Sequence, residues 1–135
     1  MRKLIIVSIA LIIFPLLAKC QYKLTIEVSP FRNNNGELLL ELSNEKGETT
    51  GRYAASIIEK RCIVIVENLN SGKYAFKYFH DENKNKKLDM NLIGMPKEGF
   101  GFSNNAKGKF GPPSFRQTIF KVNQDSLIKC IPSYL

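Results

Sequence analysis

The amino-acid sequence predicts an all-β protein, namely a two-layer antiparallel β-sandwich of the immunoglobulin-like or prealbumin-like kind, with about seven strands and one long ordered loop. Two observations predict this class. Apolar and polar residues alternate over short runs, as in strands that bury one face. Clusters of Asn, Gly, Ser and charged residues separate these runs at the short intervals typical of turns in sandwiches.

We expect two parts in the chain, a signal peptide at residues 1–20 and a single β-sandwich domain at residues 21–135. Arg2 and Lys3 precede an apolar run of about fifteen residues, which is short for a bilayer span of roughly twenty. Cleavage before Gln21 would give an exported protein, periplasmic or extracellular, with no stable membrane span.

Lipidation is the less favoured alternative for the N-terminus. Acylation at Cys20 would make the protein a lipoprotein, but Lys19 occupies a position that normally holds a small residue before such a cysteine. We therefore expect cleavage rather than anchoring.

The charge balance argues against a nucleic-acid partner. Removal of residues 1–20 takes away three basic residues and no acid, so 20 basic and 12 acidic residues become 17 and 12. The net charge falls from +8 to +5, and the remaining lysines are spread along the chain. A solvated surface is the simplest interpretation of such a distribution.

The expected strands follow one another along the chain, and most are separated by turn-forming residues at 33–36, 45–48 and 70–72. Residues 85–95 lack the alternation and have room for one helical turn beside a loop. The strands expected from the alternation are residues 22–29, 36–43, 51–58, 61–68, 73–80, 115–122 and 126–134.

Two cysteines, Cys62 and Cys130, lie in expected strands of the mature chain. A disulfide between them would close a loop of about 68 residues and would stabilise the fold by up to roughly 4 kcal/mol. Two separate buried thiols, packed as small apolar groups, are the alternative, and the sequence leaves both open.

The most informative segment is residues 79–115, because it is dense in Asn, Gly, Asp and Phe without the period of a strand or helix. Oxygen-bearing side chains alternate at its start, as they do in calcium-binding loops. An Asx-rich turn, whose side-chain oxygens accept backbone N–H groups, is the alternative. With calcium as the candidate cofactor, the predicted ligands are Asp81, Asn83, Asn85, the carbonyl of Lys87 and Asp89.

Two positions depart from a twelve-residue calcium loop. Lys86 takes the sixth position, where glycine normally supplies a positive φ, and Leu92 takes the twelfth, where a glutamate normally binds with both oxygens. We therefore expect a weak affinity for calcium.

The same segment also predicts a binding surface. Its phenylalanines can line a pocket or plug one end of the sandwich, and its asparagines offer amide donors and acceptors. The candidate ligand-binding residues are His80, Glu98, Phe102, Asn104 and Asn105. We expect a non-catalytic module that binds an envelope protein or glycan through residues 80–113. The alternative is a small hydrolase that uses His80 with Asp81 or Glu98, although no nucleophile motif accompanies them.

A resemblance covers the mature chain. Residues 69–75 read Leu-Asn-Ser-Gly-Lys-Tyr-Ala, similar to a turn Leu-x-x-Gly-x-Tyr-Ala, and residues 79–106 resemble the block FHDENGNGKLDTNLLGIPKEGYGFSNNA. Residues 110–115 complete it with FGPPSF. On these motifs the chain is identified as a member of a bacterial family of small exported proteins catalogued as domain of unknown function 2141. The resemblance implies a β-rich fold and no particular activity. Lys84 and Lys86 stand where the block has glycine.

Overall fold

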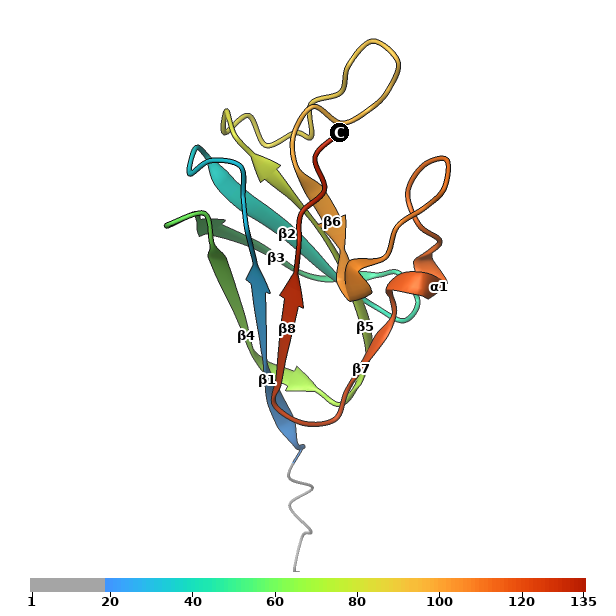
Figure 1. Cartoon of the computed structure of the whole chain (residues 1–135). Coiled ribbons are helices and arrows are strands. Elements are labelled where there is room, and N and C mark those ends of the chain that lie inside the picture. Colours follow the sequence, from blue (N-terminus) through green and yellow to red (C-terminus); the bar gives the residue numbers. More distant parts are fainter. Residues whose placement is uncertain (1–18) are drawn as a thin grey trace, which may run out of the picture.

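The structure, a computed structural model, describes residues 19–135 and confirms the two-layer β-sandwich (Figure 1). One sheet has three strands and the other has five. The strands are β1 (Gln21–Val28), β2 (Glu37–Asn44), β3 (Thr49–Ser56), β4 (Cys62–Asn70), β5 (Gly72–Asp81), β6 (Phe100–Phe102), β7 (Phe120–Val122) and β8 (Ser126–Cys130). Two short helical turns, η1 (Ser103–Asn105) and α1 (Phe115–Thr118), connect β6 to β7.

The smaller sheet has the order β4-β1-β8, and the larger has the order β3-β2-β5-β6, with β7 pairing a different part of β5. Strand β8 pairs with β1 in parallel, whereas the other ladders are antiparallel. The connection from β7 to β8 turns at the end where β1 begins, so β8 runs in the same direction as β1 (Figure 1). The sandwich is therefore antiparallel except for this one pair.

The predicted period of two is confirmed in the core. Leu24, Ile26 and Val28 of β1 are completely buried, while the residues between them are half-buried on the outer face. The same alternation holds in β2, β4 and β5. The buried side chains that the two sheets place against each other include Leu38, Leu40, Leu42, Val64, Val66, Phe76 and Tyr78.

The two cysteines are separate buried thiols. Cys62 and Cys130 pair with the same residue, Val28, from opposite sides of β1. Two strand spacings amount to about 9.6 Å, beyond the roughly 7 Å that a disulfide allows between Cα atoms. Both thiols are free, and burial raises the pKa of each to about 11, so they are poor nucleophiles at neutral pH.

Several elements differ from the prediction. Residues 115–118 form α1 rather than a strand, because Gln117 Oε1 accepts the Ser114 N–H at 2.9 Å and closes a helical turn. Strand β8 ends at Cys130 instead of residue 134, and β6 lies inside the segment that was expected to be loop. Residues 85–95 contain turns and no helix.

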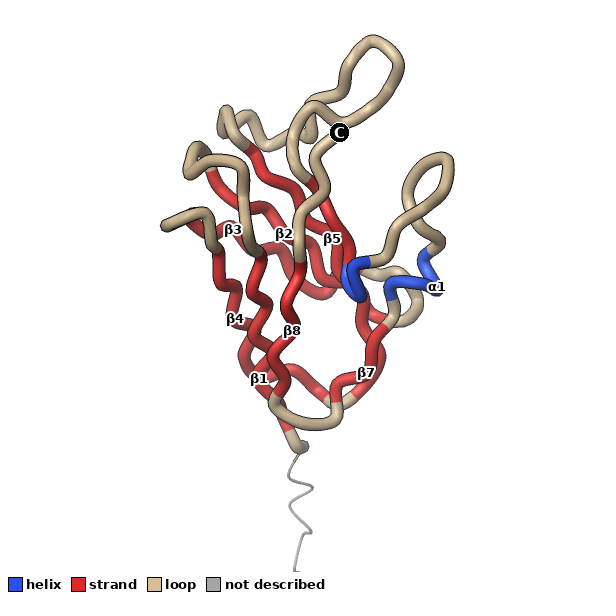
Figure 2. Tube along the Cα trace, in the orientation of Figure 1, coloured by secondary structure: helices blue, strands red, loops and turns tan. Residues whose placement is uncertain are grey.

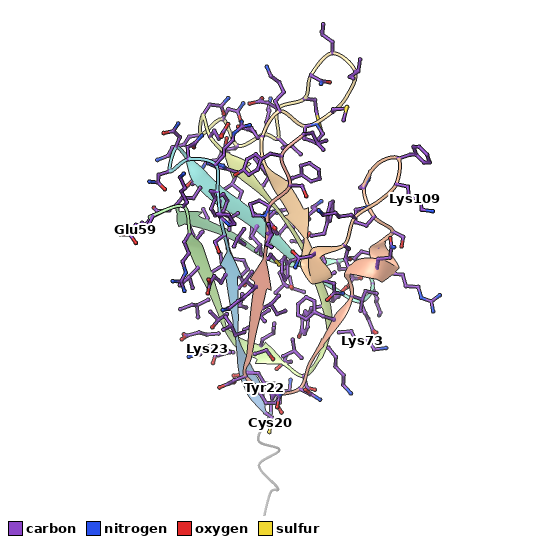
Figure 3. All side chains as sticks on the ribbon, in the orientation of Figure 1. Cys20, Tyr22, Lys23, Glu59, Lys73 and Lys109 are labelled. Atoms are coloured by element: carbon purple, nitrogen blue, oxygen red, sulfur yellow. The ribbon has the colours of Figure 1, made fainter. Side chains whose placement is uncertain are left out.

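The connections that matter for function gather at the end opposite the start of β1 (Figure 2). The β1–β2, β3–β4 and β5–β6 connections meet there with the C-terminal residues, while Cys20 marks the opposite end and Glu59 marks the β3–β4 turn (Figure 3). Most of the predicted signal peptide lies outside the described residues. Within residues 19–135, no helix is long and apolar enough to cross a membrane.

Candidate functional site

Residues 79–115 contribute to two regions with opposite character. The first, which we call the polar end, is a hydrogen-bonded set around His80, Asp81, Glu82 and Glu98 at the loop-rich end of the sandwich. The second, which we call the outer groove, is a hollow on the outer face of the larger sheet, lined in part by Phe79, Phe100 and Phe102.

His80 is completely buried near the end of β5. Its Nε2 lies 2.6 Å from the carbonyl oxygen of Asn35, and its Nδ1 lies 3.0 Å from the hydroxyl of Tyr134. Because a carbonyl only accepts, Nε2 donates to it. The edge of the ring also packs on Phe31, with centroids 5.0 Å apart. Both ring nitrogens are thus engaged, and neither faces solvent.

Asp81 is also completely buried and organises the turn that follows it. Its Oδ1 accepts the Asn85 N–H at 3.1 Å, and its Oδ2 accepts the Lys86 N–H at 2.9 Å. The amide of Asn83 donates to Asp89 at 2.7 Å, and the amide of Asn85 donates to it at 2.8 Å. Hydrogen bonds typical of an Asx-rich turn therefore connect the four predicted ligands that are side chains, Asp81, Asn83, Asn85 and Asp89.

The backbone of this turn adopts the positive φ that a calcium loop needs, although lysines occupy the positions. Lys84 has φ of +55° and Lys86 has φ of +65°. Only two of the predicted ligands, Asp81 and Asp89, carry carboxylates. In the part of the chain that the structure describes, no group of three or more His, Cys, Asp or Glu side chains is arranged to hold a metal ion.

Glu98 and Glu82 connect the turn to the rest of the polar end. Glu98 is 4% exposed, and it accepts the N–H groups of Glu82 at 3.0 Å and Asp89 at 3.2 Å. Glu82 binds Arg32 through two hydrogen bonds of 2.6 Å and also accepts from Asn33 at 2.9 Å. The Arg32 hydrogen bonds are the main cause of a lowered pKa at Glu82. Glu98 thus closes the β5–β6 loop on itself, and Glu82 ties it to the β1–β2 connection.

Asn104 and Asn105 use their amides to hold backbone. Asn104 donates from Nδ2 to the carbonyl oxygens of Gln117 and Ile119 at 3.1 and 2.9 Å. Asn105 Oδ1 accepts the Ile131 N–H at 3.0 Å. These bonds join η1 to α1 and to the residue after β8.

The outer groove has a volume of about 640 Å³. Its floor is a row across four strands, in which the register places Ala54, Leu39, Phe79 and Phe100 side by side. On this face, away from the core, Leu39, Phe79 and Phe100 are half-buried and Ala54 is exposed. We call them the apolar row. Gly101 faces inward, because a Cβ there would lie 2.2 Å from the hydroxyl oxygen of Tyr78.

A charged row lies next to the apolar row. Arg52, Glu41, Lys77 and Phe102 are neighbours in the register. Glu41 accepts from Arg52 Nε at 2.9 Å and lies 3.4 Å from Lys77 Nζ. Burial alone would raise the pKa of Glu41, but the Arg52 hydrogen bond and the Lys77 charge outweigh it and lower that pKa. The ionised carboxylate of Glu41 therefore pairs with two cations, Arg52 and Lys77.

The groove continues toward the loop that connects η1 to α1. A second hollow of about 230 Å³ shares Glu41, Lys77 and Phe102 with the first and is also lined by Pro113 and Phe115. The β5–β6 loop contributes Lys86 and Leu88 to the first hollow, and Lys86 pairs there with Glu37. The β5–β6 loop and the loop between η1 and α1 therefore border one continuous hollow.

Among the predicted ligand-binding residues, only Phe102 lines the outer groove. Phe100 is one of the phenylalanines expected to line a pocket, and it lines the groove as well, whereas the sequence analysis missed Leu39, Arg52 and Lys77. One signal was present, because Leu39 interrupts the alternation in Leu38-Leu39-Leu40 and so places a large apolar residue on the outward phase of a strand.

Comparison with known families gives one result for this chain. The sequence model of a family described as "Uncharacterized protein conserved in bacteria (DUF2141)" matches residues 26–129. The match runs from β1 into β8 and thus includes both the polar end and the outer groove. No curated protein and no solved structure matches the chain.

Proposed function

Since the chain belongs to this bacterial family of uncharacterized proteins, DUF2141, we propose that it is an exported, non-catalytic β-sandwich module that binds a ligand or partner of the cell envelope, a protein or a glycan. The segment 80–113 borders the binding surface, and the outer groove is the part of that surface that makes the contact. The polar end holds the bordering loop in place.

One observation carries this proposal. The groove exposes phenylalanines and cations in a hollow on a sheet face that would otherwise be polar. Exposed apolar patches with a few polar groups at the edge are typical of binding sites. In contrast, His80, Asp81 and Glu98 are at most 4% exposed, and each is hydrogen-bonded within the protein.

The hydrolase alternative is not favoured by this arrangement. A general base needs a nitrogen or oxygen free to take a proton from substrate or water. His80 has no free nitrogen, and the carboxylates of Asp81 and Glu98 accept backbone N–H groups. Substrate access would require the opening of this end. Purified protein should therefore release no product from p-nitrophenyl esters above the buffer rate.

Calcium is part of the proposal as an ion that orders the turn at residues 81–89. The positive φ at Lys84 and Lys86 and the position of Asp81 support it. Binding would require the amides of Asn83 and Asn85 to turn their oxygens toward the ion, because their nitrogens now face Asp89. Such a rearrangement is another reason to expect weak binding.

Export is proposed from the sequence of residues 1–20. Mass spectrometry of protein recovered from the cell envelope or medium should give the mass of residues 21–135. An intact Met1, or a lipid attached to Cys20, would contradict this part of the proposal.

Binding is tested by retention on bacterial envelope material. Labelled wild-type protein should be retained on envelope glycan or envelope protein fractions, and Phe102→Ser in the groove should reduce retention several-fold. Ile65→Ser is the matched control, because Ile65 is an exposed apolar residue on β4 of the smaller sheet and lies outside both the groove and the segment (53% relative exposure). Equal retention of the three proteins, or none for the wild type, would contradict the proposal.

A further inference from the structure

We infer that the outer groove binds an amphipathic carboxylate, whose apolar group lies on the apolar row and whose carboxylate contacts Arg52 and Lys77. This inference goes beyond the proposed function and rests on it, because it takes the groove as the binding surface and proposes that this surface also accepts a small molecule. It adds the chemical class of the ligand.

The apolar row defines the part of the ligand that has no charge. Ala54, Leu39, Phe79 and Phe100 lie on four adjacent strands, so the row is about 14 Å long at the usual strand spacing. Leu88 of the β5–β6 loop also lines this part of the hollow. The volume of about 640 Å³ lies within the range of small-molecule sites. An acyl chain or an aryl group of moderate size matches such a surface.

The charged row defines the head group. Arg52 gives its Nε to Glu41, and neither of its Nη atoms has a hydrogen-bond partner among residues 19–135. The side chains of Arg52 and Lys77 are 75% and 65% exposed, so both can turn toward a ligand. Arg52 and Lys77 carry two positive charges and Glu41 carries one negative charge, so the charged row has a surplus of one positive charge. A guanidinium edge binds a carboxylate through two parallel hydrogen bonds.

The two rows are close enough for one molecule to contact both. Leu39 and Glu41 are two residues apart on the same face of β2, and so are Phe79 and Lys77 on β5, a separation of about 7 Å along a strand. A ligand with a carboxylate at one end of a short apolar group can therefore satisfy the surplus charge and cover the phenylalanines together. A neutral apolar molecule would leave the surplus charge without a partner.

The inference is tested by calorimetric titration of the processed protein, residues 21–135. Octanoate carries its carboxylate on an acyl chain, and 4-phenylbutyrate carries it on an aryl group. Binding of either one supports the inference and shows which apolar group the groove accepts. Arg52→Gln and Lys77→Gln should each weaken binding about tenfold, as expected for the loss of one charge-assisted contact. Lys73→Gln is the matched control, because Lys73 is an exposed lysine on β5 that does not line the groove, and it should leave the affinity unchanged (Figure 3).

Neutral 1-octanol should bind at least about tenfold more weakly than octanoate, and octyltrimethylammonium should not bind. Equal affinity for octanol and octanoate, or an equal loss in Lys73→Gln and Lys77→Gln, would overturn the inference. Self-association through the groove, abolished by Phe102→Ser in sedimentation experiments, would assign the groove to a second copy and would also overturn it. If neither carboxylate binds while retention on envelope material still depends on Phe102, the ligand class is wrong and the proposed function stands.

Discussion

The polar end and the outer groove are built from the same segment of sequence, yet they use their side chains in opposite ways. At the polar end, His80, Asp81 and Glu98 are buried and form their hydrogen bonds within the protein itself. In the groove, Phe102 is half-exposed, and Arg52 keeps two nitrogens without a partner in the described chain.

This difference separates residues that hold the fold from residues that can bind. A buried carboxylate that accepts two backbone N–H groups stabilises the structure, because its removal leaves those donors unsatisfied. A half-exposed phenylalanine contributes less to stability and has surface left for a ligand. The presence of titratable residues in the segment 79–115 is therefore not enough to indicate catalysis.

The largest effect should come from Asp81→Ala. The change removes a completely buried carboxylate together with its hydrogen bonds from the N–H groups of Asn85 and Lys86, so we expect the free energy of unfolding to fall by about 3 kcal/mol. Urea denaturation measures this. Asp125→Ala is the control, because Asp125 is an exposed aspartate that accepts one N–H, and it should cost about 0.5 kcal/mol. Equal losses in the two variants would contradict this structural role of Asp81.

Calcium gives the next largest effect, and it should act on the polar end alone. With a dissociation constant on the order of 10⁻⁴ to 10⁻³ M, calcium at about 100 times that constant would stabilise the fold by about 2.7 kcal/mol. The melting temperature measures the effect, and Asp89→Asn should remove most of it. If calcium at about 10 to 100 mM and a chelator both leave the wild-type melting temperature unchanged, the segment is an Asx-rich turn without an ion.

Acid should weaken the polar end through Glu82. Its pKa is lowered in the folded protein, chiefly by the Arg32 hydrogen bonds. A lowered pKa means that the carboxylate stabilises the fold above its ordinary pKa and that this contribution is lost as the pH falls through the folded value. Because Arg32 is partly exposed, we expect only about 1 kcal/mol. Glu82→Gln should remove that amount at pH 7 and flatten the stability curve below about pH 4.5. A curve parallel to that of the wild type would contradict this assignment.

The smallest change in stability should come from the groove. Lys77→Gln alters an exposed side chain, so the free energy of unfolding should change by less than about 0.5 kcal/mol. Thermal denaturation of this variant beside Lys73→Gln is the measurement. A loss above about 2 kcal/mol would mean that the groove, too, is part of the framework.

The fold was predictable because the alternation of apolar residues is local. Leu24, Ile26 and Val28 are two residues apart, and this spacing alone identifies a strand and its buried face. The short elements were not predictable in this way. Strand β6 has three residues and forms only because β5 offers an edge to pair with, and α1 depends on a bond between Ser114 and Gln117.

The site was predictable only in part. The sequence indicates that residues 81–89 form a turn of alternating oxygens, because that pattern is local. It does not indicate that His80 lies between Asn35 and Tyr134, since those contacts join residues 45 and 54 positions away. The groove combines β2, β3, β5 and β6, and only the register brings Arg52 beside Lys77 through Glu41.

We propose that the outer groove, and not the polar end, is the binding surface. Backbone amide chemical shifts of ¹⁵N-labelled protein, recorded while solubilised envelope fractions are added, test it most directly. We expect the shifts to concentrate at residues 39–41, 52–54, 77–79 and 100–102, while the amides of His80 and Glu98 change little. Shifts centred on His80, Asp81 and Glu98, with the groove unaffected, would contradict it.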